Sequence, residues 1–382
     1  MHKNPFSDSE IEHRLSKLRD ELAARDLSAA ILSSPENVFY YTGLDHWGYF
    51  APHWLVVPTS GRPVLATRAM EKVSVANMVR SADFRGHTDA QTVADTATGI
   101  LNDLELAGER IGIEEWTSGL NHGLARSLMK QVDAHWHNIS GLVDVMRHVK
   151  SEEEQVLMRR AAAATDAATC AAIEAIRDGA PEREVAAECL AAMTLAGGEP
   201  PGFGPFIRPN NRLGEEHTTW GEGDFTAGEP VFLEIAGCVG RYNTPNGRFV
   251  HIDHAPDEDL EMAELSKKAF DAVLAALQPG KRARDIYQAW QDVVDAAGLA
   301  DYRRQHCGYV VGIAFPPSWT GGNYVAGLRH DSDVEIKTGM TFHIMSWLMN
   351  TGRGDYFLSN CVLLCENGAE VLTTSPHGPT IR

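Results

Sequence analysis

The segment FLEIAGCVGRYNTPNGRF, residues 232–249, sets a glutamate inside an apolar strand and returns along a second strand that carries an arginine. If Glu234 faces inward, its carboxylate is costly to bury without a partner, and Arg248 on the return strand is a candidate for that partner. The alternative is that Glu234 lies on the polar side of a half-buried strand. Either way, the segment predicts a strand pair that carries unusual polar chemistry.

Three further segments in the second half of the chain combine polar, aromatic and glycine residues. They are EEHTTW at 215–220, HCGYVVGIAFPPSW at 306–319 and GMTFHIM at 339–345. Taken alone, His217 is typical of a surface loop and His343 of a hydrogen-bonded core histidine. Cys238 has no neighbouring histidine in the sequence, which favours small-residue packing over a nucleophile. Residue types alone therefore indicate an α/β enzyme without defining its reaction.

The second half begins with a clear helix start. Ser151 followed by Glu154 is a capping box, and it predicts an alanine-rich helix that ends near Gly179. Pro181 is expected to open the next helix at its first position. Apolar periodicity predicts the remaining elements. These are helices at 257–277 and 284–297, and strands at 230–235, 249–252, 340–344 and 358–365.

The first half alternates helices and strands. Ile11, Leu15, Leu18 and Leu22 recur at helical spacing and form one apolar stripe. Short apolar runs at 29–32, 54–57, 63–66 and 111–113 are flanked by turn residues and predict strands. We therefore expect an α/β N-terminal domain at 1–149 and an α+β C-terminal domain at 150–382.

Composition narrows the class of protein. The 382 residues are 43% apolar and 23% charged, as in an ordinary globular chain. The formal net charge of −18, without clustered Lys or Arg, argues against nucleic acid as a partner. No apolar run approaches the ~20 residues that span a bilayer. The N-terminus lacks the apolar core of a signal peptide, so we expect a cytoplasmic protein without a membrane partner.

The six cysteines agree with a reducing compartment. They are scattered, with no C-x-x-C pair and no paired Cys/His ligand spacing. A disulfide framework or a zinc knuckle is therefore not expected.

In their order along the chain and in their residues, these motifs resemble those of the creatinase/aminopeptidase family, whose C-terminal domain has the pita-bread fold. The resemblance runs from SPENVFYYTG at 34–43 to ENGAE at 366–370, nearly the whole chain. The combination is specific, although no single motif would be. It implies a small N-terminal α/β domain followed by a pita-bread domain that carries the active site.

The aminopeptidases of that family bind two divalent metal ions through five residues. Carried onto this chain one at a time, those ligands fall on Glu234, Pro245, Tyr309, Met345 and Asn360. Among these, Glu234 is the good hard-cation ligand, because proline and methionine offer no anionic oxygen. The resemblance therefore implies a site without metal and without any other cofactor.

Two metal-free branches of the family are similar to this chain. Creatinase is similar in the closing ENGAE…GP…IR and in a histidine that corresponds to His217. The ectoine hydrolase branch is closer. It is similar in H-x-T-W at 217–220, in EIAGC…RY..P..R, in GY..G..(Y/F)PP.W and in GMTFH.M, and Asp45-His46-Trp47 also fits.

The positions at which this chain differs from the ectoine hydrolase and creatinase motifs bear on the choice of substrate. Ectoine hydrolases continue the PP.W motif with Gly-Glu-Arg-Thr, whereas this chain has WTGGN at 319–323, and they keep a glutamate where Asn360 stands. The catalytic carboxylates of creatinase fall on Gly247 and Met345. Losing carboxylates and an arginine from a small pocket could redirect substrate choice.

The resemblance to these metal-free branches implies hydrolysis of a C–N bond in a small amidine or guanidine compound, with ectoine or a related compatible solute as substrate. His217 is assigned proton transfer, because imidazole titrates near neutral pH. Glu234 is assigned amidinium binding or water orientation, and Tyr309 a hydrogen bond to the tetrahedral centre. The expected substrate-binding residues, including aromatic walls for a cation, are Trp47, Trp220, Tyr242, Arg248, Phe315, Trp319, His343 and Asn360.

Two other classes of function stay open at this point. The fold also resembles dimethylsulfoniopropionate lyases, so elimination from a small zwitterion is one alternative, although those lyases keep the metal ligands lost here. A non-catalytic binding protein is the other, and the retained pair of His217 and Glu234 argues against it. The family typically forms homodimers, so a homodimer is expected.

Overall fold

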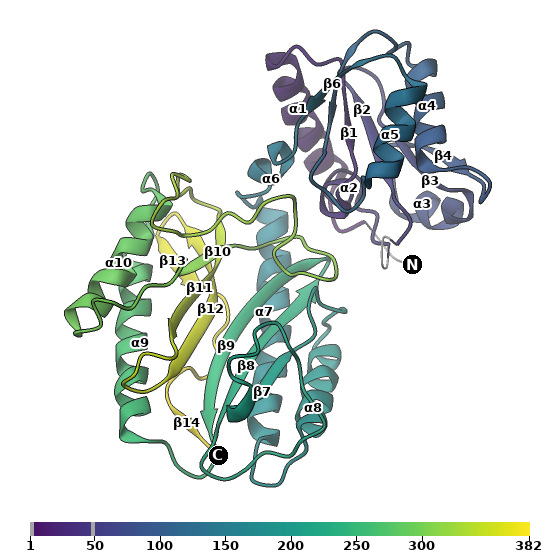
Figure 1. Cartoon of the computed structure of the whole chain (residues 1–382). Helices are drawn as coiled ribbons and strands as arrows, with labels where there is room; N and C mark the ends of the chain where they lie inside the picture. Colours follow the sequence, from purple (N-terminus) through teal and green to yellow (C-terminus); the bar gives the residue numbers. More distant parts are fainter. Residues whose placement is uncertain (1–3, 47–49) are drawn as a thin grey trace. The chain divides into compact units, whose positions relative to one another are not determined.

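The computed structural model describes residues 4–46 and 50–382, which form two compact units (Figure 1). Unit 1 comprises Met1–Arg147 and Gly321–Tyr324, and unit 2 comprises His148–Thr320 and Val325–Arg382. The sequence indicated one boundary at 149/150 and placed everything after it in the C-terminal domain. The short segment Gly321–Tyr324, which overlaps the WTGGN stretch at 319–323, instead belongs to unit 1.

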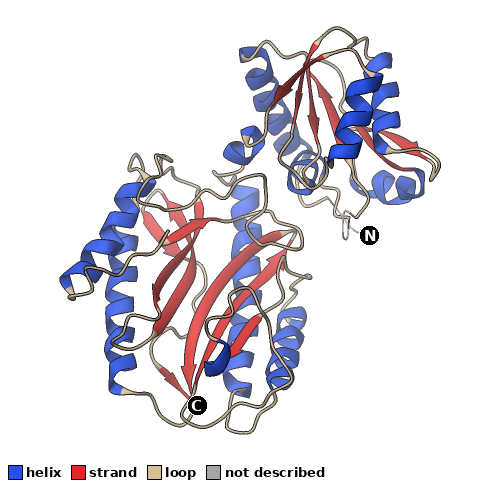
Figure 2. Ribbon diagram, viewed as in Figure 1, coloured by secondary structure: helices blue, strands red, loops and turns tan. Residues whose placement is uncertain are grey.

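Unit 1 is a six-stranded sheet with helices on both sides (Figure 2). The strand order is β4-β3-β2-β1-β5-β6, parallel except where β2 pairs with β1 and β3. The strands are β1 (Ala29–Leu32), β2 (Trp54–Pro58), β3 (Val64–Arg68), β4 (Asp83–His87), β5 (Arg110–Ile113) and β6 (His135–Asn138). The helices are α1 (Asp8–Ala24), α2 (Pro35–Thr42), α3 (Lys72–Met78), α4 (Val93–Asp103), α5 (His122–Gln131) and α6 (Leu142–Met146), with a 3₁₀ turn at Ala69–Glu71.

The N-terminal stripe is confirmed as the buried face of α1. Ile11, Leu15, Leu18 and Leu22 are all buried, and the Ser7 side chain caps the helix by accepting a hydrogen bond from the Glu10 backbone N–H. The predicted strands at 29–32, 54–57, 63–66 and 111–113 correspond to β1, β2, β3 and β5. Strands β4 and β6 were not predicted, because most of their residues are polar and at least partly exposed and so form no apolar run.

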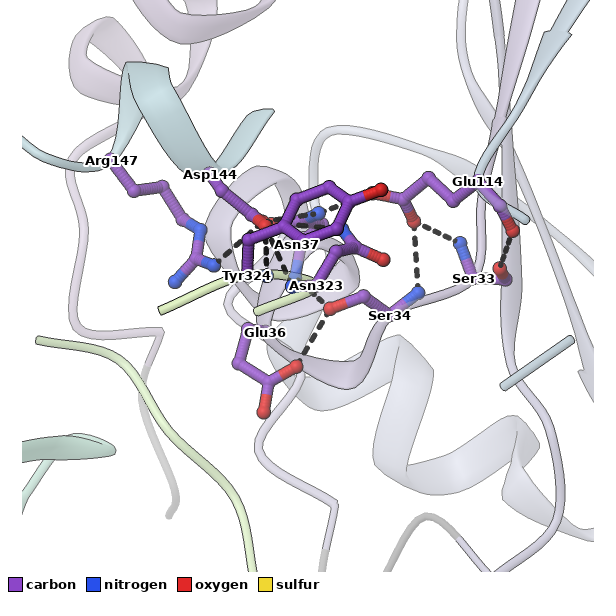
Figure 3. A network of polar contacts seen from close by, with 9 residues as sticks. All are labelled: Ser33, Ser34, Glu36, Asn37, Glu114, Asp144, Arg147, Asn323 and Tyr324. Carbon is purple, nitrogen blue, oxygen red and sulfur yellow. Dashed lines mark hydrogen bonds and ion pairs between the residues drawn. The ribbon is translucent and has the colours of Figure 1, made fainter. Parts of the chain in front are cut away.

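A buried polar network ties the Gly321–Tyr324 segment into unit 1 (Figure 3). Asp144 accepts hydrogen bonds from the backbone N–H groups of Asn323, at 2.6 Å, and Tyr324, at 3.3 Å. Arg147 Nη2 is 3.1 Å from the same carboxylate. Glu114 accepts bonds from the N–H groups of Ser33 and Ser34, at 2.7 and 2.9 Å, and from the Asn37 side-chain amide.

Glu114 is expected to make the stability of the protein pH-dependent. It is fully buried, and burial raises its pKa from 4.5 to about 7. Between these values the folded protein keeps a proton that the unfolded chain has released, so the free energy of unfolding falls as pH rises. At roughly 1.4 kcal/mol per pH unit, the loss amounts to about 3 kcal/mol by pH 7. Urea unfolding of wild type and Glu114→Gln at pH 4.5 to 8 measures it.

The Glu114→Gln variant should gain stability relative to wild type as pH rises through this window. Glu115→Gln is the matched control, because Glu115 is exposed, and its curve should run parallel to that of wild type. If the Glu114→Gln curve is also parallel, Glu114 does not carry the pH dependence.

Unit 2 is built on an eight-stranded sheet. Its central order is β10-β11-β12-β9-β8-β7, with β13 added to β12 and β14 to β9. The strands are β7 (Phe206–Pro209), β8 (Pro230–Val239), β9 (Tyr242–His251), β10 (Gly308–Val310), β11 (Thr341–Leu348), β12 (Tyr356–Cys365), β13 (Gly368–Val371) and β14 (Thr380–Ile381). The helices are α7 (Glu152–Ala175), α8 (Glu182–Leu195), α9 (Asp257–Ala276) and α10 (Ala283–Ala296), with a 3₁₀ turn at Asn210–Arg212.

The largest differences from the predicted helix boundaries of unit 2 are at two places, while α9 and α10 differ by at most one residue at either end. The capping box of Ser151 and Glu154 is confirmed, but α7 ends at Ala175 because Ile176 is extended, and Gly179 lies in the turn beyond with φ +73°. Pro181 is the N-cap of α8 rather than its first residue, since its ψ of 136° is extended. Both differences come from the loop that joins the two helices.

The two faces of the unit 2 sheet have different surroundings. Leu233 and Ile235 of β8 pack in one apolar cluster with alanines of α7 and with Val185 of α8. Gly237 continues this face, and a Cβ there would lie 2.6 Å from the carbonyl oxygen of Ala161, so only glycine allows α7 to approach so closely. Because side chains alternate along a strand, Glu234 points away from α7 and toward the opposite face of the sheet.

In the described residues, no helix is both long and apolar enough to cross a membrane.

Candidate functional site

A cavity of about 760 Å³ opens on the face of the sheet that Glu234 faces. Side chains from four strands contribute to its lining: Arg208 of β7, Glu234 of β8, Tyr309 of β10, and Met345 and Trp347 of β11. Loop residues complete it, among them Phe203, Glu216, His217, His306, Trp319 and Thr320. The site therefore depends on strands and loops that are far apart in the sequence.

Four of the residues predicted from the sequence line this cavity: His217, Glu234, Tyr309 and Trp319. Trp47 lies outside the described residues. The other six predicted substrate-binding residues are not part of the lining; His343 lies directly behind Tyr309, Trp220 is partly buried against an apolar cluster, and the rest are in the protein core. The structure thus brings together the three residues to which we assign catalysis, while their roles stay predictions.

Glu234 is the buried acid of the cavity. It is 8% exposed, and burial raises its pKa to about 8, while the guanidinium of Arg208 acts in the opposite direction. Its Oε1 is 4.0 Å from His343 Nε2, too far for a hydrogen bond. Near neutral pH the carboxyl therefore holds its proton, and a cationic group beside it would favour the ionised form.

Tyr309 takes part in a chain of hydrogen bonds behind the cavity wall. Trp319 Nε1 donates to the Tyr309 hydroxyl at 2.9 Å, and that hydroxyl is 3.0 Å from His343 Nδ1. His343 Nε2 is 2.6 Å from Ser359 Oγ. Burial lowers the pKa of His343 to about 3, so its ring is neutral and carries one N–H.

The tautomer of His343 decides what Tyr309 offers a ligand. With the proton on Nε2, the Tyr309 hydroxyl must donate its hydrogen to Nδ1 and presents only a lone pair to the cavity. With the proton on Nδ1, His343 and Trp319 both donate to the Tyr309 oxygen, and its hydrogen is free to point at a ligand. Ser359 then donates to Nε2.

His217 reaches the cavity from the loop between β7 and β8. It is exposed, and its φ of +59° is in the left-handed region. Its ring lies 6.2 Å from the Phe203 ring and 6.0 Å from the Phe206 ring. The imidazole therefore stands at an aromatic wall of the cavity.

Arg248 is not the partner of Glu234, contrary to the expectation. In the register of β8 and β9, Arg248 stands opposite Leu233, whereas Gly247 stands opposite Glu234, so the two charged side chains lie on opposite faces. Arg248 instead bonds the carbonyls of Pro376, Ser359 and Ser375 and the side-chain oxygen of Asn360. These bonds fix the core on the helix side of the sheet.

Asn360 is likewise on the helix side, bonded to Arg248 and Thr373. The carry-over of the last metal ligand onto Asn360 is therefore wrong by one position. The strand register instead puts Ser359 in one row with Glu234, Gly247 and Met345 across the four strands.

Three of the other predicted residues have core contacts. Trp220 packs against the apolar cluster of α7 and α8. The Tyr242 hydroxyl donates to Glu154 at 2.6 Å, and the ring of Phe315 receives the guanidinium of Arg241 at 5.0 Å. Cys238 is buried as well. These contacts account for their burial without a ligand.

The row that contains Glu234 does not suit a hard divalent cation. Besides Glu234 it offers a glycine, a serine and a thioether, and Tyr309 stands beside it. A side chain at Gly247 is blocked, because its Cβ would lie 2.0 Å from the Phe357 ring. Across residues 4–46 and 50–382 no group of three His, Cys, Asp or Glu side chains is placed to hold a metal ion. These residues therefore do not fit a dinuclear metal centre.

Sequence reasoning missed the positive charges of the cavity. Arg208 and Arg304 line it. His306 lines it too, but burial lowers its pKa to about 4, so its imidazole is neutral near pH 7 and adds no charge. An arginine inside the short apolar run FIRP at 206–209 is the signal that could have identified Arg208. It went unnoticed because this strand was not predicted.

Comparison with known proteins gives a consistent family. The chain matches the model of metallopeptidase family M24 over residues 156–366 and that of the creatinase/prolidase N-terminal domain over residues 14–149. An ectoine hydrolase from Halomonas elongata is 27% identical, over 98% of this chain and 97% of the relative. A creatinase from a Bacillus species is 25% identical, over 99% and 93%. An Xaa-Pro dipeptidase structure from Bacillus anthracis superposes with a TM-score of 0.85 at 19% identity, over 97% of this chain and 100% of that chain.

Proposed function

Because the chain belongs to metallopeptidase family M24 and carries a creatinase/prolidase N-terminal domain, we propose that it hydrolyses a C–N bond of a small amidine or guanidine compound without a metal ion. The proposed substrate is ectoine or a related compatible solute. Membership confirms the family and the pita-bread fold that the sequence motifs predict. The substrate and the metal-free reaction are our proposal.

One observation carries it: a buried glutamate faces a cavity whose neighbouring positions have lost the oxygen ligands of a metallopeptidase. Glu234 suits a cationic amidinium, because the cation would replace the missing charge partner and restore the ionised form. The similarity to an ectoine hydrolase and a creatinase supports hydrolysis of such a group. A peptidase mechanism would need the two metal ions that this row of residues does not fit.

The reaction can be divided among the three residues that line the cavity. Glu234 holds the amidinium and orients it toward water. His217 takes a proton from the attacking water as the C–O bond forms, and returns it to the departing nitrogen as the C–N bond breaks. Tyr309, with His343 protonated on Nδ1, donates a hydrogen bond to the tetrahedral centre. The products are an amide and an amine, or a urea and an amine from a guanidine.

From the cyclic amidines ectoine and hydroxyectoine, the expected product is a single ring-opened compound that is heavier than the substrate by one water. From creatine, two products are expected whose masses add up to creatine plus one water. Purified protein incubated with ectoine, hydroxyectoine and creatine, followed by mass spectrometry, tests this. The rate should not change when a chelator is present, and metal analysis should find far less than one divalent ion per chain. An alkene product would identify a lyase instead. Two tightly held metal ions per chain would overturn the metal-free proposal.

The proposal places the protein in the cytoplasm as a homodimer that acts on a small molecule, with neither nucleic acid nor membrane as a partner. The net charge of −18 supports the exclusion of nucleic acid.

A further inference from the structure

Arg208 is a buried cation that lacks a matching anion. The residue is 1% exposed, and among the described residues no carboxylate lies within ion-pair distance of it. Its Nη1 donates to the carbonyl of Glu215 at 2.6 Å, its guanidinium lies 4.1 Å from the centre of the Phe232 ring, and its Nε has no hydrogen-bond partner in the described part of the chain.

Such an arrangement lowers the stability of the protein when no ligand pairs with the guanidinium. Burying a charge that is neither paired nor fully hydrogen-bonded opposes folding, and here burial also lowers the pKa of the guanidinium. One carbonyl and one aromatic face use only part of its five N–H donors. Because Arg208 lines the cavity, a ligand that enters the cavity could supply the missing acceptors.

The position of Arg208 relates it to Glu234. In the pairing of β7 with β8, Phe206 stands opposite Glu234 and Arg208 stands opposite Phe232. Arg208 and Glu234 are therefore diagonal neighbours on the same face, with Cα atoms about 7–8 Å apart. Each has the other as its strongest charged neighbour, yet no ion pair between them is formed.

We propose that Arg208 is the specificity residue for a substrate carboxylate, so that the cavity selects a small zwitterion. The cationic carbon–nitrogen group lies at Glu234 and the carboxylate at the guanidinium fork of Arg208, a geometry that guanidinium groups bind well. This inference rests on the proposed function for the cationic half of the substrate.

A second arginine strengthens the positive side of the cavity. Arg304 is half-buried and lies 4.7 Å above the centre of the Trp347 ring. Arg303, in contrast, is exposed at the rim and bonds the carboxylate of Asp295 at 2.8 Å. Its charge is already paired, which makes Arg303 a matched control for Arg208.

The test uses two pairs of ligands that differ only in the carboxylate. They are ectoine with 2-methyl-1,4,5,6-tetrahydropyrimidine, and creatine with N,N-dimethylguanidine. Binding to the full chain is measured by calorimetry, and mass spectrometry checks every sample for product. In wild type, the carboxylate member of at least one pair should bind about 30-fold more tightly or better.

The Arg208→Met variant should lose this preference while it keeps its affinity for the compound without a carboxylate. Arg208→Lys, which keeps the charge but not the fork, should retain part of the preference, and Arg303→Gln all of it. Without ligand, Arg208→Met should unfold at the same temperature as wild type or higher, because an unpaired buried charge has been removed.

Three results would overturn the inference. In the first, wild type shows no preference for the carboxylate members, or binds neither member. In the second, Arg208→Met keeps the preference. In the third, Arg208→Met weakens the binding of both members of a pair alike, as expected for a purely structural arginine. The binding readout is independent of turnover. A preference that depends on Arg208, without any hydrolysis, would support the carboxylate subsite and contradict the proposed reaction. Hydrolysis with an unchanged preference in Arg208→Met would support the proposed reaction and contradict the carboxylate subsite.

Discussion

Replacing His217 with asparagine is expected to lower kcat by about 10²–10⁴-fold, the usual contribution of a side chain that transfers a proton in the rate-limiting step. Asparagine has no group that titrates near neutral pH, so it removes proton transfer while keeping a polar side chain at the cavity wall. The fold should be unaffected, because His217 is exposed. Steady-state kinetics on the substrate identified by mass spectrometry measures the change.

The choice of asparagine follows from the backbone. With φ at +59°, His217 is in the left-handed region, where alanine costs about 1–2 kcal/mol and asparagine is tolerated better. His217→Ala should also abolish turnover, but its loss combines missing chemistry with a strained loop. His217→Asn isolates the chemistry.

His254→Asn serves as the matched control, because this histidine is exposed, lies beside Asp253 and is not part of the cavity lining. Its kcat should stay within about twofold of wild type, as for an ordinary surface substitution. Should His217→Asn retain the kcat of wild type, the proton-transfer role would have to move to another residue.

Local sequence patterns predicted α1, the four long helices of unit 2 and the central strands of both units, but not helices α2 to α6. The capping box of Ser151 and the apolar stripe of Ile11 to Leu22 each depend on neighbours within a few residues, and both are confirmed. The same holds for Glu234 as the polar interruption of a strand. The residues that lie beside Glu234 on the neighbouring strands could not be predicted from local patterns. They depend on strand register, which is a long-range property: a shift of one residue moves a side chain to the other face of the sheet.

Arg248 and Asn360 show this limit directly. Each is one residue from a position in the row of Glu234, namely Gly247 and Ser359, and each therefore points toward the helices instead. The membership of Gly321–Tyr324 in unit 1 is equally non-local, since it depends on hydrogen bonds to Asp144, about 180 residues earlier in the chain. Family motifs found His217 and Tyr309, and only the fold relates Arg208 to Glu234.

Glu234→Gln is expected to lower kcat/KM by about 10³-fold or more, within the range for loss of a buried charged partner, and to remove the pH dependence that this residue gives wild type. In free wild-type protein the pKa of Glu234 is raised to about 8, chiefly by burial. Only the ionised form pairs with an amidinium. Over the pH range in which His217 is neutral, as its role as a base requires, the kcat/KM of wild type should therefore rise by about tenfold per pH unit up to 8 and level off above it.

The sign of this pH dependence separates two roles for the same carboxyl. If Glu234 acted as the acid that protonates the departing nitrogen, kcat/KM would fall above pH 8 instead of levelling off, and the amidinium-binding assignment would be wrong. The pH profile of kcat should show its rise at lower pH than that of kcat/KM, because the bound cation lowers the pKa of Glu234 in the complex. Glu216→Gln supplies the matched control, because the charge of Glu216 raises the pKa of Glu234. This variant should keep the amplitude of the kcat/KM profile and shift its midpoint to lower pH. Glu234→Gln, in contrast, should flatten the profile.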